Sequence, residues 1–239
     1  MALDGATMTN VLLSWSSGKD SAWALYLLSK RTDVRVVALV TTFNHAADRV
    51  AMHAVRSSLV HEQAKRVRLP LWPVELPWPC SNAHYEELMR AVCKLAMDEE
   101  IGAIAFGDLF LQDIRDYRER QLAGTGLEPL FPVWQIPTGQ LATDMLAAGV
   151  KAKITCVDPA QLDKAFAGRD YNSELLEELP SHADPCGENG EFHTFVYDSP
   201  MFTEPISVET GEIVERDGFV FADVVAQPVC HSSEHLPSR

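Results

Sequence analysis

The chain has 239 residues, of which 46% are hydrophobic and 23% charged, and its formal net charge at pH 7 is −14. This composition is that of a globular protein and excludes a disordered, collagen-like or fibrous chain. The acidic balance also argues against non-specific binding of nucleic acid, because neutralising phosphates requires clustered lysine and arginine. The charge is uneven: residues 1–75 carry 9 basic and 6 acidic side chains, against 11 and 28 in the remainder. An anionic ligand is therefore expected to bind the N-terminal part.

The cysteines and the apolar segments predict a cytoplasmic protein with no membrane partner. The five cysteines, spread from Cys80 to Cys230, form neither a disulfide framework nor a CxxC zinc motif. The longest strongly apolar run, residues 34–40, is too short to cross a bilayer. The first ten residues lack the basic segment of a secretion signal.

The N-terminal half alternates apolar strands with helices. Strands are predicted over 10–15, 34–43, 71–76, 103–106 and 130–134, and helices over 20–30, 54–68, 82–97 and 111–122. Ser81 is a suitable N-cap for the third helix. This order predicts a Rossmann-like α/β domain with a five-stranded parallel sheet and helices on both faces. Ligands bind such sheets at the carboxyl ends of the strands.

Pro137 marks a break in the pattern. A helix over 140–148, a strand over 152–157 and a further helix starting at Asp158 and Pro159 are predicted beyond it. We therefore expect an α/β domain over 1–135, a smaller α+β domain over 136–225 and a flexible tail over 226–239.

A polar loop follows the first strand and is the strongest candidate site. It consists of Ser16, Ser17, Gly18, Lys19, Asp20 and Ser21. A short loop before a helix presents backbone N–H groups and the positive end of the helix dipole to an anion. It differs from the common nucleotide P-loop, because Leu13 replaces the first glycine and Asp20 follows the lysine. The local sequence alone fits a phosphate cradle and a serine-capped helix about equally well.

Two later segments add polar side chains. Gly107 and Asp108 follow the fourth strand at the sheet edge of the loop, where a carboxylate can approach a nucleotide or Mg²⁺. A turn-capping aspartate is the alternative for Asp108. Residues 184–194 gather two glycines, two glutamates, a cysteine and a histidine into one turn. Taken alone, that turn is better explained as a flexible acidic hairpin.

These three segments together resemble a known family. The run over 16–21 is similar to the SGGKDS pyrophosphate loop of the PP-loop ATPases, with Ser17 in the place of a glycine. A positive φ at Ser17 would be strained, so a slightly adjusted loop is expected. With residues 107–134 and 184–194, the chain resembles the diphthine-ammonia ligase family, ATP-binding domain 4, over about residues 10–202. The segment after Gly107 and the DPCGE start of the later turn look like the bacterial form of that family.

The resemblance implies an HUP-type fold and an amide ligase that uses ATP and Mg²⁺. Such an enzyme adenylates a carboxylate acceptor, releases pyrophosphate, and forms an amide with ammonia as AMP leaves. The family's named reaction amidates diphthine, which bacteria lack, so the acceptor stays open between a small molecule and a modified protein side chain. The second domain would bind this acceptor. The oligomeric state is open between monomer and homodimer.

The resemblance also implies roles for individual residues. The catalytic residues would be Lys19, Asp108, Glu188 and Glu191. Mg²⁺ would be held by Asp20 and Asp108. Besides residues 16–21, the nucleotide would contact Thr42, Phe43, His53 and Gly107. The acceptor would contact Arg115, Arg118, Cys186, Gly187 and His193. Taken alone, His53 is better explained as a structural histidine, and the two arginines as solvated helix charges.

Two other functions remain as alternatives. A PP-loop sulfur transferase acting on RNA commonly uses paired or cluster-forming cysteines, and no such spacing is visible here. Cys93 and Cys156 are better explained as buried structural thiols. A nucleotide-binding sensor without turnover has no evident need for the distant acidic turn. The sequence therefore favours the ligase.

Overall fold

The computed structural model describes residues 8–44, 48–50 and 55–227. Within these residues, six strands form the first sheet: β1 (Thr9–Ser14), β2 (Val34–Asn44), β3 (Arg49–Val50), β4 (Leu71–Leu76), β5 (Ala103–Ala105) and β6 (Glu128–Leu130). Five of them are parallel in the order β4-β2-β1-β5-β6, and the short β3 pairs antiparallel with the end of β2. The predicted five-stranded parallel sheet is thus confirmed, with β3 added to it.

Helices cover both faces of this sheet, as predicted. They are α1 (Lys19–Ser29), α2 (Ser57–Val67), α3 (Asn82–Asp98) and α4 (Gln112–Leu122). Successive residues of a strand point to opposite faces. Accordingly, Val11 and Leu13 pack in one core cluster with α1 and α2, while Leu12 packs in the other with α3. Ser81 caps α3 through a bond from the His84 N–H, 3.2 Å long.

The strand predicted over 130–134 begins and ends earlier in the sequence than predicted. The structure has β6 at Glu128–Leu130, and the chain turns over residues 132–135. Pro132 has no N–H to donate to a neighbouring strand, so the ladder ends before it.

The helix predicted from Asp158 was wrong. The Asp158 side chain accepts hydrogen bonds from the Ala160 N–H at 2.9 Å and from Gln161 Nε2 at 2.8 Å, which closes a turn. Such local bonds compete with helix formation. Only a short 3₁₀ helix, η1 (Lys164–Phe166), follows.

The C-terminal region forms a second, antiparallel sheet. In the described residues it has five strands: β7 (Lys151–Val157), β8 (Asp170–Tyr171), β9 (Phe192–Asp198), β10 (Val208–Arg216) and β11 (Phe219–Ala226). Two helices accompany it, α5 (Thr138–Ala147) and α6 (Ser173–Glu178). Helix and antiparallel sheet together agree with the predicted α+β character.

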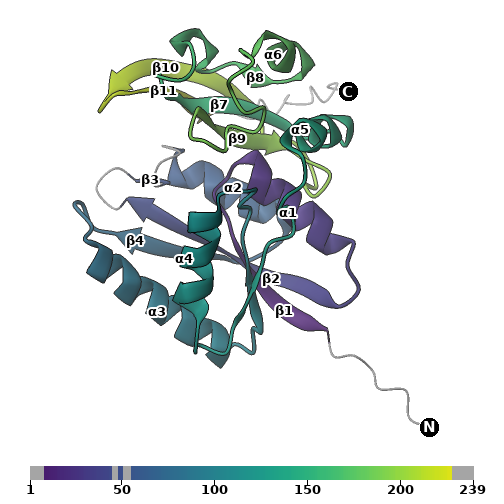
Figure 1. Cartoon of the computed structure of the whole chain (residues 1–239), viewed down its shortest axis with the longest axis vertical. Coiled ribbons are helices and arrows are strands. Elements are labelled where there is room, and N and C mark those ends of the chain that lie inside the picture. The colour runs from purple at the N-terminus through teal and green to yellow at the C-terminus, as the bar shows by residue number, and fades with distance from the viewer. Residues whose placement is uncertain (1–7, 45–47, 51–54, 228–239) are drawn as a thin grey trace, which may run out of the picture.

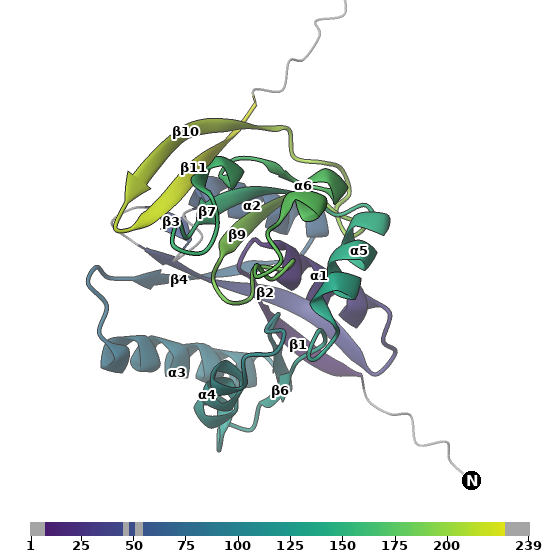
Figure 2. The same cartoon turned by 45° about the horizontal axis from the view of Figure 1, so that its top comes forward.

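The second sheet lies over α1 and α2 on one side of the first sheet (Figures 1 and 2). Strand β9 contacts α1 directly. A second link joins β11 to the region around β3 and α2, where Asp223 pairs with Arg49 at 2.9 Å and with Arg56 at 2.5 Å. These contacts place the turn before β9 at the carboxyl edge of the parallel sheet. In the part of the chain that the structure describes, no helix is long and apolar enough to span a bilayer.

Candidate functional site

A cavity of 260 Å³ opens at the carboxyl ends of β1 and β5. Strand β1 lies between β2 and β5, so the strand order reverses direction at β1. In open α/β sheets, ligands bind outside the carboxyl ends of the strands at such a reversal. The cavity is walled by the loop after β1, the segment after β5, α4, and the turn before β9. Of the predicted site residues it brings together Ser16, Lys19, Asp20, Ser21, Gly107, Asp108, Arg118, Cys186, Gly187, Glu188 and His193.

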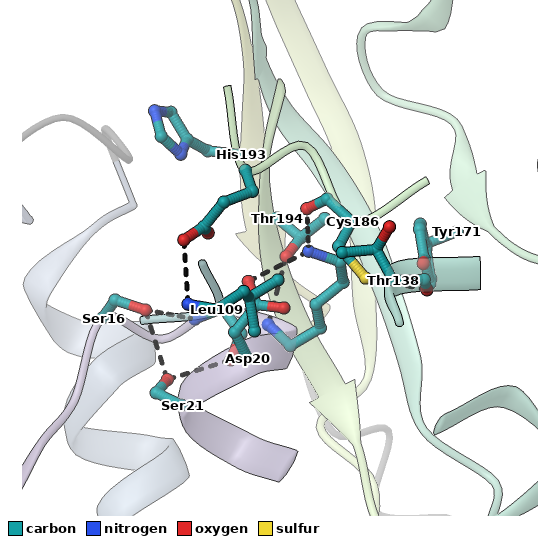
Figure 3. A network of polar contacts seen from close by, with 12 residues as sticks. Ser16, Asp20, Ser21, Leu109, Thr138, Tyr171, Cys186, His193 and Thr194 are labelled. Carbon is teal, nitrogen blue, oxygen red and sulfur yellow. Dashed lines mark hydrogen bonds and ion pairs between the residues drawn. The ribbon is translucent and has the colours of Figure 1, made fainter. Parts of the chain in front are cut away.

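The loop after β1 keeps the left-handed backbone that a glycine would supply. Ser17 has a φ of 70°, so the adjustment expected for a serine at this position does not occur. Beside it, Ser16 Oγ accepts a 3.3 Å hydrogen bond from the Gly18 N–H and lies 3.2 Å from Ser21 Oγ (Figure 3). The two hydroxyls therefore form one wall of the cavity.

Lys19 lies at the junction of the two sheets and is only 2% exposed. Its ammonium is 3.0 Å from Asp20 Oδ2 and also donates to the Cys186 carbonyl. Burial by itself lowers the pKa of Lys19, but the acidic groups around it, Asp20 first among them, together outweigh this, and the pKa is raised. The side chain is therefore a buried cation held by both halves of the chain.

Strand β9 supplies further contacts of this lysine. The backbone N–H of Lys19 donates to Thr194 Oγ1 at 3.1 Å, and the ring centroid of Phe192 lies 5.4 Å from the ammonium. Figure 3 shows Asp20, Cys186 and Thr194 close together at the start of α1. The C-terminal sheet is thus bonded directly to the start of α1.

Two carboxylates in the cavity have unsatisfied oxygens. Among the described residues, neither Asp20 Oδ1 nor Asp108 Oδ2 has a hydrogen-bond partner, although both atoms are buried. Arg118 Nε lies 3.6 Å from Asp108 Oδ2, which is an ion-pair distance and too long for a hydrogen bond. Burial raises the pKa of both carboxyls. A cation between them would satisfy both oxygens.

These two carboxylates offer the oxygen ligands that Mg²⁺ prefers. No group of three or more His, Cys, Asp or Glu side chains suited to a metal occurs among the described residues. Mg²⁺ keeps several water ligands and needs only one or two protein carboxylates.

Glu188 joins the C-terminal turn to the segment after β5. Its Oε1 accepts hydrogen bonds from the N–H groups of Leu109 at 2.8 Å and Phe110 at 3.4 Å. Burial raises the pKa of Glu188 to about 7. The carboxylate therefore changes its charge close to neutral pH.

Glu191, predicted as a catalytic residue, does not reach the cavity. The side chain is 1% exposed and lies within the turn instead of lining the cavity. It accepts hydrogen bonds from the Asp184 N–H at 2.8 Å, the Asn189 N–H at 3.0 Å and Asn189 Nδ2 at 3.0 Å. These bonds close the turn that carries Cys186 and Glu188 to the cavity.

Glu191→Gln is expected to lower the free energy of unfolding by about 2 kcal/mol, because the new amide NH₂ faces backbone donors that then lack an acceptor. Denaturant titration measures this loss. Glu188→Gln is the matched control: it is half-buried and keeps an oxygen for Leu109, so its loss should stay below about 1 kcal/mol. Equal losses for the two variants would contradict the different placement of these glutamates.

Besides Glu191, five described residues of the predicted site do not line this cavity: Ser17, Gly18, Thr42, Phe43 and Arg115. Arg115 packs its guanidinium 4.6 Å from the Phe131 ring centroid and bonds Glu119 at 2.8 Å. Phe43 is a core residue stacked on His61, and Thr42 lies on β2 opposite Val74. Their roles would require contacts outside the cavity. His53 falls outside the described residues.

Thr194 lines the cavity and Gln63 and Tyr171 lie beside it, although the sequence did not single them out as functional. Gln63 is fully buried beneath the loop, and Tyr171 lies with its ring centroid 5.6 Å from the Lys19 ammonium. One signal was available: Gln63 follows Leu59 and Val60 at the helical spacing of a core-facing residue.

Three of the four described cysteines are unsuited to sulfur transfer. Cys80, Cys93, Cys156 and Cys186 are all free thiols. Burial raises the pKa of Cys156 and Cys186 to about 12, and it also raises that of Cys93. Since the thiolate is the nucleophile, these three buried thiols are unreactive at neutral pH.

Comparison with known proteins gives the same family for both halves of the chain. The model of the diphthamide synthase N-terminal domain matches residues 8–129, and that of the diphthamide synthase C-terminal domain matches residues 138–224. The diphthine--ammonia ligase of Mus musculus is 30% identical over 152 residues, which cover 61% of this chain and 56% of the mouse protein. That of Danio rerio is 25% identical over 231 residues, covering 87% of this chain and 90% of the fish protein.

The match to Schizosaccharomyces pombe diphthine--ammonia ligase is shorter relative to that protein: 27% identity over 170 residues, which cover 28% of it. The chain thus spans about half of the mouse relative and a smaller share of the yeast one. The two domain matches nevertheless follow one another along nearly the whole described chain. The chain belongs to the diphthamide synthase family.

Proposed function

We propose that this protein is an amide ligase of the PP-loop type, which activates a carboxylate acceptor with ATP and couples it to ammonia. The observation that carries the proposal is the cavity that joins the loop after β1, two carboxylates with unsatisfied oxygens, and a glutamate from the C-terminal turn. The name of the curated relatives, diphthine--ammonia ligase, supports the same reaction class. On this proposal, residues 1–135 bind ATP and residues 136–225 supply the acceptor side.

The first step is attack of the acceptor carboxylate on the α-phosphate of ATP, which gives an acyl-adenylate and pyrophosphate. The loop after β1, with the N-terminus of α1 and the Lys19 ammonium, stabilises the negative charge of the phosphates. Asp20 and Asp108 would hold Mg²⁺, which supplies further positive charge to the phosphate oxygens. Arg118, free of a hydrogen bond to Asp108, is positioned to attract an anionic acceptor.

In the second step, ammonia attacks the acyl carbon and AMP leaves. The attacking nitrogen must lose a proton, and Glu188 is the cavity carboxylate whose charge state changes near pH 7. We assign Glu188 as the general base. Glu191 acts through the turn as a positioning residue.

The rate of ammonia transfer is expected to rise with pH through about 7, because Glu188 accepts a proton only in its deprotonated form. The measurement is kcat/KM for ammonia against pH, with the concentration of free NH₃ held constant at each pH. Glu188→Gln should lower the rate about a hundredfold and remove this inflection. An inflection that survives unchanged in the variant would assign the base to another group.

The reaction itself is tested with α-labelled ATP. Purified protein is incubated with ammonium and either a diphthine peptide or a panel of small carboxylic acids. Labelled AMP that forms only when an acceptor is present supports the ligase. ADP as the product, or tight ATP binding without any product across the whole set, would overturn it, and the second result would favour a nucleotide sensor.

A further inference from the structure

We propose that Gln63 of α2 is a positioning residue that holds the loop after β1 in its binding conformation. Nothing in the proposed reaction or in the relatives' names assigns a role to this side chain. The inference rests on the proposed function only in taking the loop as the phosphate site. The loop has Ser17 where a glycine is usual, and Gln63 would keep Ser17 in the left-handed backbone conformation that the site requires.

The Gln63 amide is fully buried and all its hydrogen bonds go to the loop and to β9. Its Oε1 accepts from Trp15 Nε1 at 2.8 Å, while its Nε2 donates to the carbonyls of Ser17 at 3.0 Å and Val196 at 2.6 Å. The indole N–H can only donate, so it fixes which end of the amide carries the oxygen. The two amide hydrogens must therefore point to the two carbonyls.

Ser17 needs such support because its backbone is strained. A side chain disfavours the left-handed region, which costs a residue other than glycine free energy unless its surroundings hold it there. The Ser17 hydroxyl supplies no compensation, since within the described residues it is buried without a hydrogen-bond partner. The Ser17 carbonyl, in contrast, accepts from Gln63 and from the Val196 N–H at 2.9 Å.

These bonds tie the loop to two distant elements. Gln63 lies on α2 and Val196 on β9, so helix, loop and C-terminal sheet meet at one carbonyl. When Gln63 is lost, Ser17 can relax towards negative φ, and the fraction of protein with a competent loop falls. The apparent dissociation constant for ATP rises in inverse proportion to that fraction.

The test uses Gln63→Met, Ser17→Gly and the double variant in the full-length protein. Gln63→Met keeps the side-chain length and removes the three hydrogen bonds, and should weaken ATP binding about tenfold or more in titration calorimetry. Ser17→Gly alone supplies the reference affinity, because glycine adopts positive φ without strain. In the double variant, affinity should lie within about threefold of that of Ser17→Gly, so that the loss caused by Gln63→Met largely disappears.

A second readout follows the loop without nucleotide. Hydrogen exchange at the Val196 amide reports the bond to the Ser17 carbonyl. Exchange should accelerate in Gln63→Met and slow again in the double variant. If Gln63→Met does not fold, Gln63→Leu is used instead, because it also stays neutral and also removes the three hydrogen bonds.

Ser199→Ala is the control for a general loss of stability. Ser199 is a buried serine whose hydroxyl accepts from the Met201 N–H in a local turn, so Ser17→Gly should not alter the effect of replacing it. If Ser17→Gly restores neither ATP affinity nor Val196 protection in the Gln63 variant, Gln63 is a packing residue and the inference is overturned. If protection is lost and restored while even the wild type fails to bind ATP, the positioning role stands and the proposed function fails.

Discussion

Lys19→Ala is expected to abolish AMP formation and to destabilise the fold as well. The ammonium is bonded to Asp20 and to the Cys186 carbonyl and is closed off from solvent. Removing it leaves a largely desolvated carboxylate without its cation, and breaking a buried pair in this way typically costs about 3–5 kcal/mol. Since the Asp20 side chain remains a quarter exposed, we expect the lower end of that range, about 3 kcal/mol.

The two effects of Lys19 can be separated by a double variant. Asp20→Asn combined with Lys19→Met removes both charges, so a large part of the lost stability should return. Turnover should stay at least about a thousandfold below the wild type, because the positive charge beside the phosphates is still missing. Urea unfolding and release of labelled AMP measure the two quantities.

Lys30→Ala is the matched control at the C-terminal end of the same helix. Lys30 is exposed and only covers the Tyr26 ring, with its ammonium 3.9 Å from the ring centroid. Its loss should cost less than about 1 kcal/mol and leave turnover intact. A Lys19→Ala protein as stable as Lys30→Ala would show that Lys19 does not bridge the two halves in solution.

The sequence predicted the parallel sheet well because its signals are local. The apolar residues of β1 and β2 and the helical spacing in α1 and α3 are each visible within one segment. The errors arose where one local signal overrode another. At Asp158 a cap followed by proline reads as a helix start, but the side chain closes a turn on Ala160 instead.

The candidate site was predictable in kind but not in detail. Residue type and position at the sheet edge located the loop after β1 and Asp108, because parallel strands end at a common edge. The pattern could not distinguish Glu188 from Glu191, three positions apart in one turn, because the direction of each carboxylate is set by tertiary contacts. The role of Gln63 was hidden for the same reason: two of its partners lie 46 and 133 positions away.

Asp108→Asn is expected to remove Mg²⁺-dependent turnover, about a hundredfold or more, while leaving the fold as stable as the wild type. Burial raises the pKa of the Asp108 carboxyl in the folded protein above its value in the unfolded chain. The stability that this carboxyl contributes is therefore complete below the pKa of the unfolded state and is lost as pH rises through the pKa of the folded state. The charged form of the buried carboxylate thus lowers the free energy of unfolding, and the neutral amide of the variant removes this destabilisation. Arg118 loses an ion-pair partner in the variant, but it is partly exposed and can be solvated.

The decisive comparison is with Asp20→Asn, since both residues are assigned to the same cation. Asp20 is hydrogen-bonded to the buried Lys19, whereas Asp108 has, among the residues that the structure describes, no side-chain ion pair closer than its 3.6 Å contact to Arg118. Both variants should lose turnover, and raising Mg²⁺ should restore part of it in each, but only Asp20→Asn should lower the unfolding free energy. Asp113→Asn, an exposed carboxylate on α4, controls for charge and should change neither quantity. If Asp108→Asn keeps the wild-type dependence on Mg²⁺, the cation does not bind at Asp108.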